Sequence, residues 1–386
     1  MIRKIPLAWL QLTREKTRLA VALAGIAFAD ILMFMQLGFR DALFDGNVQL
    51  HKSLEGDIVL INPQSEALLS METFSQRRLY QALAVKEVKS VHPIYVDFTG
   101  WKNPQNQKLR SIQVVGFNPK EHVFNLPGIQ QNLDKIKLRD VVLFDRGSRA
   151  EFGEVATNID QGKTIITEVG GRQIKVKGTF QLGTSFGADG NLITSDLNFI
   201  RLFNNERRKQ GLIDIGLIKL EPGANTEVVL EKLKNYLPKD VLVLSKQEFV
   251  DFEKSYWASS TPIGFIFTFG TIIAFIVGTV IVYQILYSEV SEHLPEYATL
   301  KAMGYTQNYL LLVIFKEALI LACLGYMPGF AFAIFQYKMA SDATLLPIVM
   351  TGSRAVLVLI LTILMCSISG VIAVRKLRSA DPADIF

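Results

Sequence analysis

The sequence predicts a membrane protein with four transmembrane α-helices and a large α+β extracytoplasmic domain between the first and the second helix. The mean hydropathy of +0.26 is high for a soluble protein. The apolar residues gather in four runs, each near the roughly 20 residues that a helix needs to cross the hydrocarbon core. Between the first two runs, short Val- and Ile-rich stretches alternate with turn residues, which is typical of a folded α+β domain.

The predicted organisation follows these runs along the chain. It consists of a cytoplasmic amphipathic helix (1–18), a first span (19–40), a periplasmic α+β domain (41–258), a second span (263–287), an inner loop (288–308), a third span (309–335), a short periplasmic loop (336–354), a fourth span (355–374) and a cytoplasmic tail (375–386). The leader also fits an ordinary polar segment without membrane contact.

The orientation is predicted from Lys and Arg residues next to the spans, which favour the cytoplasmic side. Basic residues are frequent in 1–18 and in 375–378, so both termini are placed on the cytoplasmic side of the membrane. An alternative for the first span is a cleaved secretory signal ending near Ala27-Phe28-Ala29. The apolar run continues beyond that point, which favours a membrane-spanning helix.

The outer domain contains a βαβ pattern at its C-terminal end. Leu212 to Leu220 predicts a strand, Thr226 to Leu237 a helix, and Val241 to Leu244 a second strand. Gly170-Gly171 predicts a hairpin. Further predicted elements are the strands 57–61, 140–144, 163–166 and 173–177 and the helix 76–84.

No catalytic or metal-binding pattern stands out. The net charge of +5 and the lack of a basic-aromatic patch argue against nucleic acid, and Cys323 and Cys366 lie inside apolar runs. Walker A and HExxH patterns are absent, so no cofactor is expected in this chain. The single GxSxG pattern, Gly183 to Gly187, is followed by a turn instead of the helix that a nucleophile elbow requires. We therefore expect no enzymatic activity.

Three charged residues lie well inside the predicted spans, away from their ends. They are Asp30 in the first span and Lys316 and Glu317 in the third. Such groups are costly in hydrocarbon and usually face a partner, the bundle interior or water. Asp30 and Lys316 lie at similar depth, so we hypothesise that they pair. A proton or substrate pathway, or neither role, is the alternative.

Small residues predict close helix packing in the third span. Gly325 and Gly329 are four residues apart, with Pro328 between them. Gly270 and Gly278 could act similarly in the second span. The spacing fits either packing within one subunit or a dimer interface.

The inner loop begins with acidic residues and continues as a short amphipathic stretch that Gly304 closes, as a helix C-cap glycine does. At these residues the chain resembles ABC permeases of the MacB/FtsX type, which carry ERxxEIGxLRAxG after their second span. Glu292, Glu296, Leu300, Ala302 and Gly304 match this motif, whereas His293 and Lys301 replace its arginines and Tyr297-Ala298 replace Ile-Gly.

The resemblance extends over the whole chain in the order of one span, outer domain and three spans. Leu294 to Gly304 and Gly183 to Gly190 are most similar to DevC-type permeases of cyanobacterial exporters. The resemblance implies a homodimer in the lipid bilayer that transmits ATP-driven motion. It also implies a separate ABC ATPase that binds ATP and Mg, a membrane-fusion periplasmic adaptor, and a TolC-like outer-membrane protein, with a glycolipid or other amphiphile as cargo.

The same resemblance assigns residues to ATPase coupling. They are Glu289, Glu292, His293, Glu296, Leu300, Lys301, Met303, Gly304 and Tyr305. Two alternatives remain open: an FtsX-like regulatory subunit that activates a periplasmic partner, and a lipoprotein-release permease. Residues Gly183 to Asn191 are candidates for adaptor docking if they lie at the tip of the outer domain.

Overall fold

The computed structural model describes residue 14 and residues 16–203 and 211–379. The chain divides into two units. Residues 1–42, 263–343 and 348–386 form a helical unit, and residues 43–262 and 344–347 form an α+β domain. Of the predicted leader helix 1–18, residues 1–13 and 15 lie outside the described part of the chain, as do residues 380–386 of the predicted tail.

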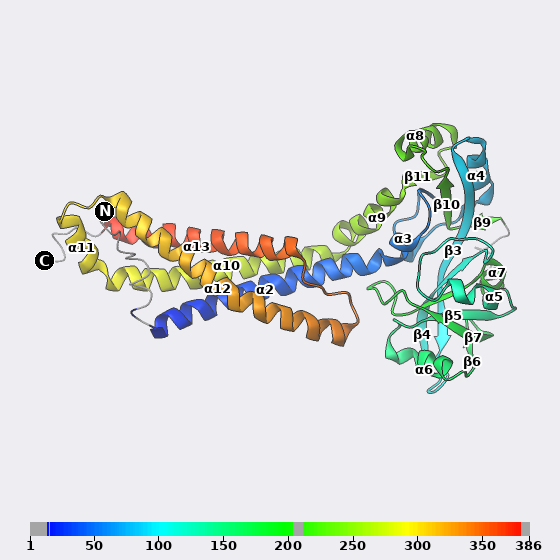
Figure 1. The fold of residues 1–386 in the computed structure, drawn as a ribbon, viewed down its shortest axis with the longest axis horizontal. Helices are drawn as coiled ribbons and strands as arrows, with labels where there is room; N and C mark the ends of the chain where they lie inside the picture. The colour runs from blue at the N-terminus through cyan, green and yellow to red at the C-terminus, as the bar shows by residue number, and fades with distance from the viewer. Residues whose placement is uncertain (1–13, 15, 204–210, 380–386) are drawn as a thin grey trace. The chain divides into compact units, whose positions relative to one another are not determined.

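Long helices that run side by side build the helical unit (Figure 1). Within the described residues, four helices are long and apolar enough to cross a membrane, as predicted. Each contains one predicted span but is longer than that span at one or both ends. The helices are α2 (Lys16–Asn47), α10 (Pro262–Glu292), α11 (Leu294–Ala302), α12 (Gln307–Thr344) and α13 (Gly352–Ser379), of which α11 is the short one.

The burial of α10 shows what kind of surface this unit presents. Only 17% of its most apolar stretch is buried within the chain, although that stretch has a mean hydropathy of 2.5. A helix that is apolar all round and largely exposed in a single chain is typical of contact with lipid or with another membrane helix. The fold class predicted from the sequence, four apolar helices with an α+β domain inserted after the first, is therefore confirmed.

A mixed sheet forms the centre of the α+β domain. In the described part of the chain its nine strands have the order β11-β1-β10-β3-β4-β8-β5-β7-β6, and β2 pairs with β9 in a separate small sheet. The strands are β1 (Ile58–Ile61), β2 (Phe74–Ser75), β3 (Val88–Lys102), β4 (Leu109–Phe117), β5 (Val141–Asp145), β6 (Ile165–Val169), β7 (Arg172–Phe180), β8 (Asn191–Ser195), β9 (Leu212–Ile213), β10 (Ile215–Leu220) and β11 (Leu242–Ser245).

The long strand β3 gives this sheet its shape. Its first half, Val88 to Ile94, pairs with β10, and its second half, Ile94 to Lys102, pairs with β4. Trp101 near its end also pairs with Val169 of β6. The strands from β3 to β6 therefore close into a ring. The predicted βαβ unit is present in a split form, because β10 and β11 both pair antiparallel with β1, which lies between them.

Two apolar cores lie on opposite faces of the sheet. Ile58 and Leu60 of β1 belong to one core, whereas Val59 and Ile61 belong to the other, as the alternation of side chains along a strand requires. The covering helices are α3 (Gln49–Ser53), α4 (Gln76–Gln81), α5 (Leu133–Ile136), α6 (Val155–Asp160), α7 (Asp196–Leu202), α8 (Thr226–Tyr236) and α9 (Lys246–Ser255), with 3₁₀ turns at 68–70, 82–84, 130–132 and 150–152 and a π turn at 256–260.

Candidate functional site

The predicted coupling loop forms the short helix α11, which a glycine closes. Gly304 has a φ of +92°, a conformation that favours glycine. The N–H of Tyr305 donates to the carbonyl of Leu300 over 3.1 Å. This bond across five residues is the Schellman closure of a helix C-terminus. The chain thus turns sharply after α11 and enters α12.

Met303 and Tyr305 project from this turn. Met303 is 63% exposed and Tyr305 46% exposed, and the Tyr305 ring lies 4.9 Å from that of Tyr309. Large exposed side chains of this kind mark contact surfaces when they lie together. Of the residues predicted to contact an ATPase, these two present the most accessible apolar surface.

The acidic residues of the motif point in two directions. Glu289 and His293 are 5% and 9% exposed and share an inward face, because residues four apart lie on the same side of a helix. The side chains of Glu292 and Glu296 are 48% and 51% exposed. Glu289 therefore presents little surface to a partner, and its role in ATPase coupling stays a prediction. Leu300 is half-buried, and the side chain of Lys301 lies outside the described part of the structure.

Two arginines from the N-terminal segment engage the outward acids. The guanidinium of Arg18 forms a bidentate ion pair with the Glu292 carboxylate. Arg14 lies 3.6 Å from Glu296, whose other oxygen is 3.1 Å from Nδ1 of His293. The sequence analysis used these arginines only to orient the chain. The structure shows that they also hold the segment before the first span against the coupling loop.

The intramembrane charges Asp30 and Lys316 do not pair. Asp30 is fully buried and accepts a hydrogen bond of 2.6 Å from the Thr362 hydroxyl of α13, while Lys316 is exposed. The two residues also lie at different levels, because Asp30 packs beside Gly329 of α12, which is about 20 Å of helix beyond Lys316. The predicted similar depth is therefore wrong. Lys316 and Glu317 point about 100° apart, so an inward Glu317 turns Lys316 outward.

Glu317 is fully buried, and neither of its carboxylate oxygens has a hydrogen-bond partner. Asp30 likewise has one oxygen, Oδ2, without a partner. Unpaired buried carboxylates are costly in hydrocarbon and mark functional positions more often than structural ones. The structure places these two acids inside the helical unit at different levels, and their role stays a hypothesis.

The glycines of the third span pack against α2 of the same chain. A Cβ atom at Gly325 would lie 2.6 Å from Cγ2 of Ile26, and one at Gly329 would lie 3.2 Å from Cα of Ala27. At Gly270 in α10 it would lie 2.5 Å from Cδ of Gln36. These positions therefore serve packing within one subunit, which is one of the two alternatives left open by their spacing.

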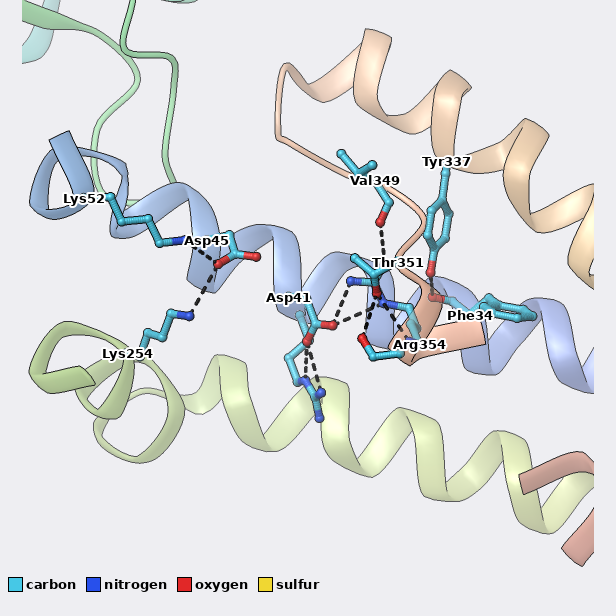
Figure 2. A network of polar contacts seen from close by, with 11 residues as sticks. Phe34, Asp41, Asp45, Lys52, Lys254, Tyr337, Val349, Thr351 and Arg354 are labelled. Atoms are coloured by element: carbon cyan, nitrogen blue, oxygen red, sulfur yellow. Dashed lines mark hydrogen bonds and ion pairs between the residues drawn. The ribbon is translucent and has the colours of Figure 1, made fainter. Parts of the chain in front are cut away.

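A buried arginine links three helices of the helical unit. Arg354 is 5% exposed and donates to the Asp41 carboxylate (2.7 and 3.2 Å) and to the Val349 carbonyl (2.7 Å). Its guanidinium lies 5.5 Å from the ring centre of Tyr337, whose hydroxyl donates to the carbonyl of Phe34. Figure 2 shows these contacts among α2, α12 and α13.

The α+β domain has its own polar network where the chain enters and leaves it. Asp45 lies 3.1 Å from Lys52 and 3.4 Å from Lys254 (Figure 2). Nearby in the fold, the buried Glu253 accepts from the Trp257 indole N–H and the Leu68 N–H, both over 2.8 Å. These bonds fix α9 to the segments at the start of the domain.

The glycine-rich loop 183–190 lies at this junction and not at a distant tip. The Gly187 N–H donates to Oδ1 of Asn47 over 3.0 Å, and the Thr184 hydroxyl donates to the Leu345 carbonyl over 3.2 Å. The buried carboxylate of Asp145 accepts the N–H of Gly183. Docking of an adaptor through the loop as a tip is therefore not supported. Ser185 bonds back to Ala188 in a turn, as the sequence predicted.

A comparison with protein families identifies the C-terminal part of the chain. Residues 264–382 match the family described as FtsX-like permease C-terminal. The match begins at the third residue of α10 and includes all of α11, α12 and α13. No curated protein matches the sequence at a significant level.

Solved structures similar to this one include two domains of transporters. The periplasmic region of MacB from Actinobacillus actinomycetemcomitans is 13% identical, with a TM-score of 0.34, over 50% of this chain and 91% of that one. The extracellular domain of the noncanonic ABC-type transporter YknZ from Gram-positive bacteria is 15% identical, with a TM-score of 0.33, over 49% and 99%. Residues 264–382, which include the loop 288–308, are thus similar to the C-terminal domain of FtsX-like permeases.

Proposed function

We propose that this chain is the permease subunit of an ABC exporter of the DevC-type within the MacB/FtsX group. It would pass ATP-driven motion from a separate cytoplasmic ATPase to a periplasmic adaptor and a TolC-like outer-membrane duct, as a homodimer in the inner membrane with both termini in the cytoplasm. A glycolipid or another amphiphile is the proposed cargo. Catalysis and the binding of ATP and Mg belong to the ATPase subunit in this proposal.

One observation carries the proposal: a capped helix within the FtsX-like domain presents Met303 and Tyr305 beside two half-exposed acids. An apolar anchor with charged neighbours is the usual composition of a protein contact. The Arg18–Glu292 ion pair and the Gly304 closure hold this surface in one conformation. A contact that transmits force needs such a fixed geometry, because a flexible loop would absorb the movement.

Co-purification from crosslinked, detergent-solubilised membranes tests the proposal. Wild-type chain with a C-terminal tag should recover an ABC ATPase and a membrane-fusion adaptor. Met303→Glu should lose the ATPase and keep the adaptor, because it places a charge in the apolar contact. Val228→Glu is the matched control, since Val228 is 50% exposed on α8 of the α+β domain.

Recovery of no ATPase with the wild-type chain, or equal recovery with Met303→Glu, would refute the coupling assignment. An ATPase recovered together with a periplasmic hydrolase in place of an adaptor would point to the regulatory alternative, and one recovered together with acylated proteins to lipoprotein release.

A further inference from the structure

A small cavity in the α+β domain has buried hydrogen-bond donors without acceptors. Its volume is about 10 Å³, and its lining includes Asn47, Gln113, Phe98, Leu69 and Trp257. Asn47 is 6% exposed and Gln113 3% exposed, yet Nδ2 of Asn47 and Nε2 of Gln113 have no hydrogen-bond partner. Leaving such groups unpaired is costly, so the cavity calls for an acceptor.

The orientation of the Asn47 amide is fixed by its neighbour. Oδ1 of Asn47 accepts the Gly187 N–H over 3.0 Å, which leaves the NH₂ group for the cavity. Two further acceptors line the cavity, the Glu253 carboxylate and the Ser185 hydroxyl. The carboxylate already accepts the indole N–H of Trp257 and the N–H of Leu68, and the Ser185 oxygen accepts the N–H of Ala188. The NH₂ groups of Asn47 and Gln113 are the donors in the lining that have no partner.

These features select the charge and shape of an occupant. The Glu253 carboxylate disfavours an anion, so a fatty-acid carboxylate or a phosphate fits poorly. A carbonyl oxygen is neutral, is small enough for a cavity of this volume, and accepts two hydrogen bonds without bringing a donor. A water molecule also fits this volume and, after accepting from both amides, can donate to Ser185 or Glu253, so the apolar rim is what distinguishes the two occupants.

The mouth of the cavity is apolar. Leu69 is 40% exposed and Phe186 54% exposed, and the Phe186 ring lies edge-on to Trp257 at 5.6 Å. A Cβ atom at Gly187 would be 3.4 Å from both Leu69 and Trp257, so this glycine leaves the rim narrow and free of side-chain bulk. Hydrocarbon attached to the carbonyl would lie over these side chains.

We propose that this cavity binds the carbonyl group of a neutral acyl ester or amide, with Asn47 and Gln113 as donors and the acyl chain lying over Leu69 and Phe186. The inference rests on the proposed function for the cargo class, an amphiphile, and adds a place in the α+β domain where the linkage between acyl chain and head group is recognised.

A competition between two matched amphiphiles tests this site. The full chain, purified in dodecyl maltoside, is mixed with equal amounts of monolauroylglycerol, an ester, and 1-O-dodecylglycerol, an ether without the carbonyl. Native mass spectrometry then compares the two adducts. The ester should exceed the ether by about tenfold, the value of one to two hydrogen bonds. Gln113→Met should bring the ratio close to one.

The controls separate this site from other effects. Gln173→Met makes the same change at an exposed position of β7 and should leave the ratio unchanged. Gln113→Glu, nearly isosteric, should abolish the preference for the ester and keeps the test decisive if Gln113→Met does not fold. Equal adducts in the wild-type chain, or the same ratio in folded Gln113 variants, would identify a water site and overturn the proposal.

This outcome is independent of the ATPase contact. Met303→Glu should leave the ester preference intact, and Gln113→Met should leave ATPase recovery intact. Failure of one experiment therefore does not imply failure of the other.

Discussion

Replacement of Arg354 by Met should destabilise the helical unit by about 3 kcal/mol. Arg354 is nearly buried, and the change removes two hydrogen bonds to Asp41, one to the Val349 carbonyl and the contact with the Tyr337 ring. Breaking a buried ion pair from one side costs about 3–5 kcal/mol. The side chain of Asp41 is 33% exposed, so water compensates part of that loss and the low end applies.

The two cysteines make this stability measurable. Cys366 is buried, whereas Cys323 is exposed. In a Cys323→Ala background, a thiol-reactive dye therefore reports unfolding around Cys366 alone. A loss of about 3 kcal/mol corresponds to a decrease in the midpoint of roughly 6–12 °C for a unit of this size. Arg354→Lys keeps the positive charge but loses the planar guanidinium group. Its unfolding midpoint should therefore lie between those of the wild-type chain and Arg354→Met.

A double variant separates the ion pair from simple loss of packing. Asp41→Leu together with Arg354→Met replaces both charges by apolar groups and should regain much of the lost stability, because the buried Arg354 charge is gone and Arg40, the other partner of Asp41, is 30% exposed to solvent. A double variant as unstable as the sum of the two single ones would refute this reasoning. A decrease of less than about 2 °C in the unfolding midpoint of Arg354→Met would also refute it, because the Arg354–Asp41 pair would then contribute no more than a weak surface ion pair.

Three further predictions follow from the contacts described above. Glu292→Arg should release the ATPase and Arg18→Glu added to it should restore binding in the same co-purification, because the swapped charges pair again. Gly325→Leu should lower the midpoint of dye-detected unfolding by more than Gly352→Leu, since a Cβ at Gly352 meets nothing within 4 Å. The Ser245 N–H donates to the Glu248 carboxylate and lowers its pKa. The capping box should therefore stabilise α9 above the unfolded pKa of Glu248, and this stability should be lost as the pH falls through the folded pKa. Glu248→Gln should make the stability of the α+β domain depend less on pH in the acidic range.

Hydropathy and turn residues predicted the long helices and several strands, because these signals depend on residues that are neighbours in the sequence. Gly170-Gly171 sits at the β6–β7 hairpin with both glycines at positive φ, 58° and 76°. The helix at 226–237 was predicted to within one residue at its end. In contrast, β3 and β4 were not predicted, although they are the longest paired strands of the sheet. In these two strands polar and apolar residues do not alternate cleanly, because the side chains on both faces of the sheet pack into apolar cores. The alternation that predicts a strand is therefore missing.

The pairing of distant residues could not be predicted in the same way. Asp30 meets Thr362, and Asp41 meets Arg354, each across more than 300 residues of sequence. Charge and estimated depth suggested Lys316 as the partner of Asp30, but Asp30 packs beside Gly329, because counting residues from the inner face does not fix how two helices are shifted along each other. Gln113 gave no signal, since a glutamine in a strand is ordinarily exposed.

The contacts of α2 bring these observations together. The glycines of α10 and α12 pack on it, Thr362 of α13 bonds to its Asp30, and Arg354 bonds to its Asp41. Arg18, which pairs with Glu292, belongs to the same helix. A helix resists bending much more than a loop does. If the ATPase moves the Glu292 side of the Arg18 ion pair, α2 is therefore the element best suited to carry that displacement to the other long helices of the helical unit.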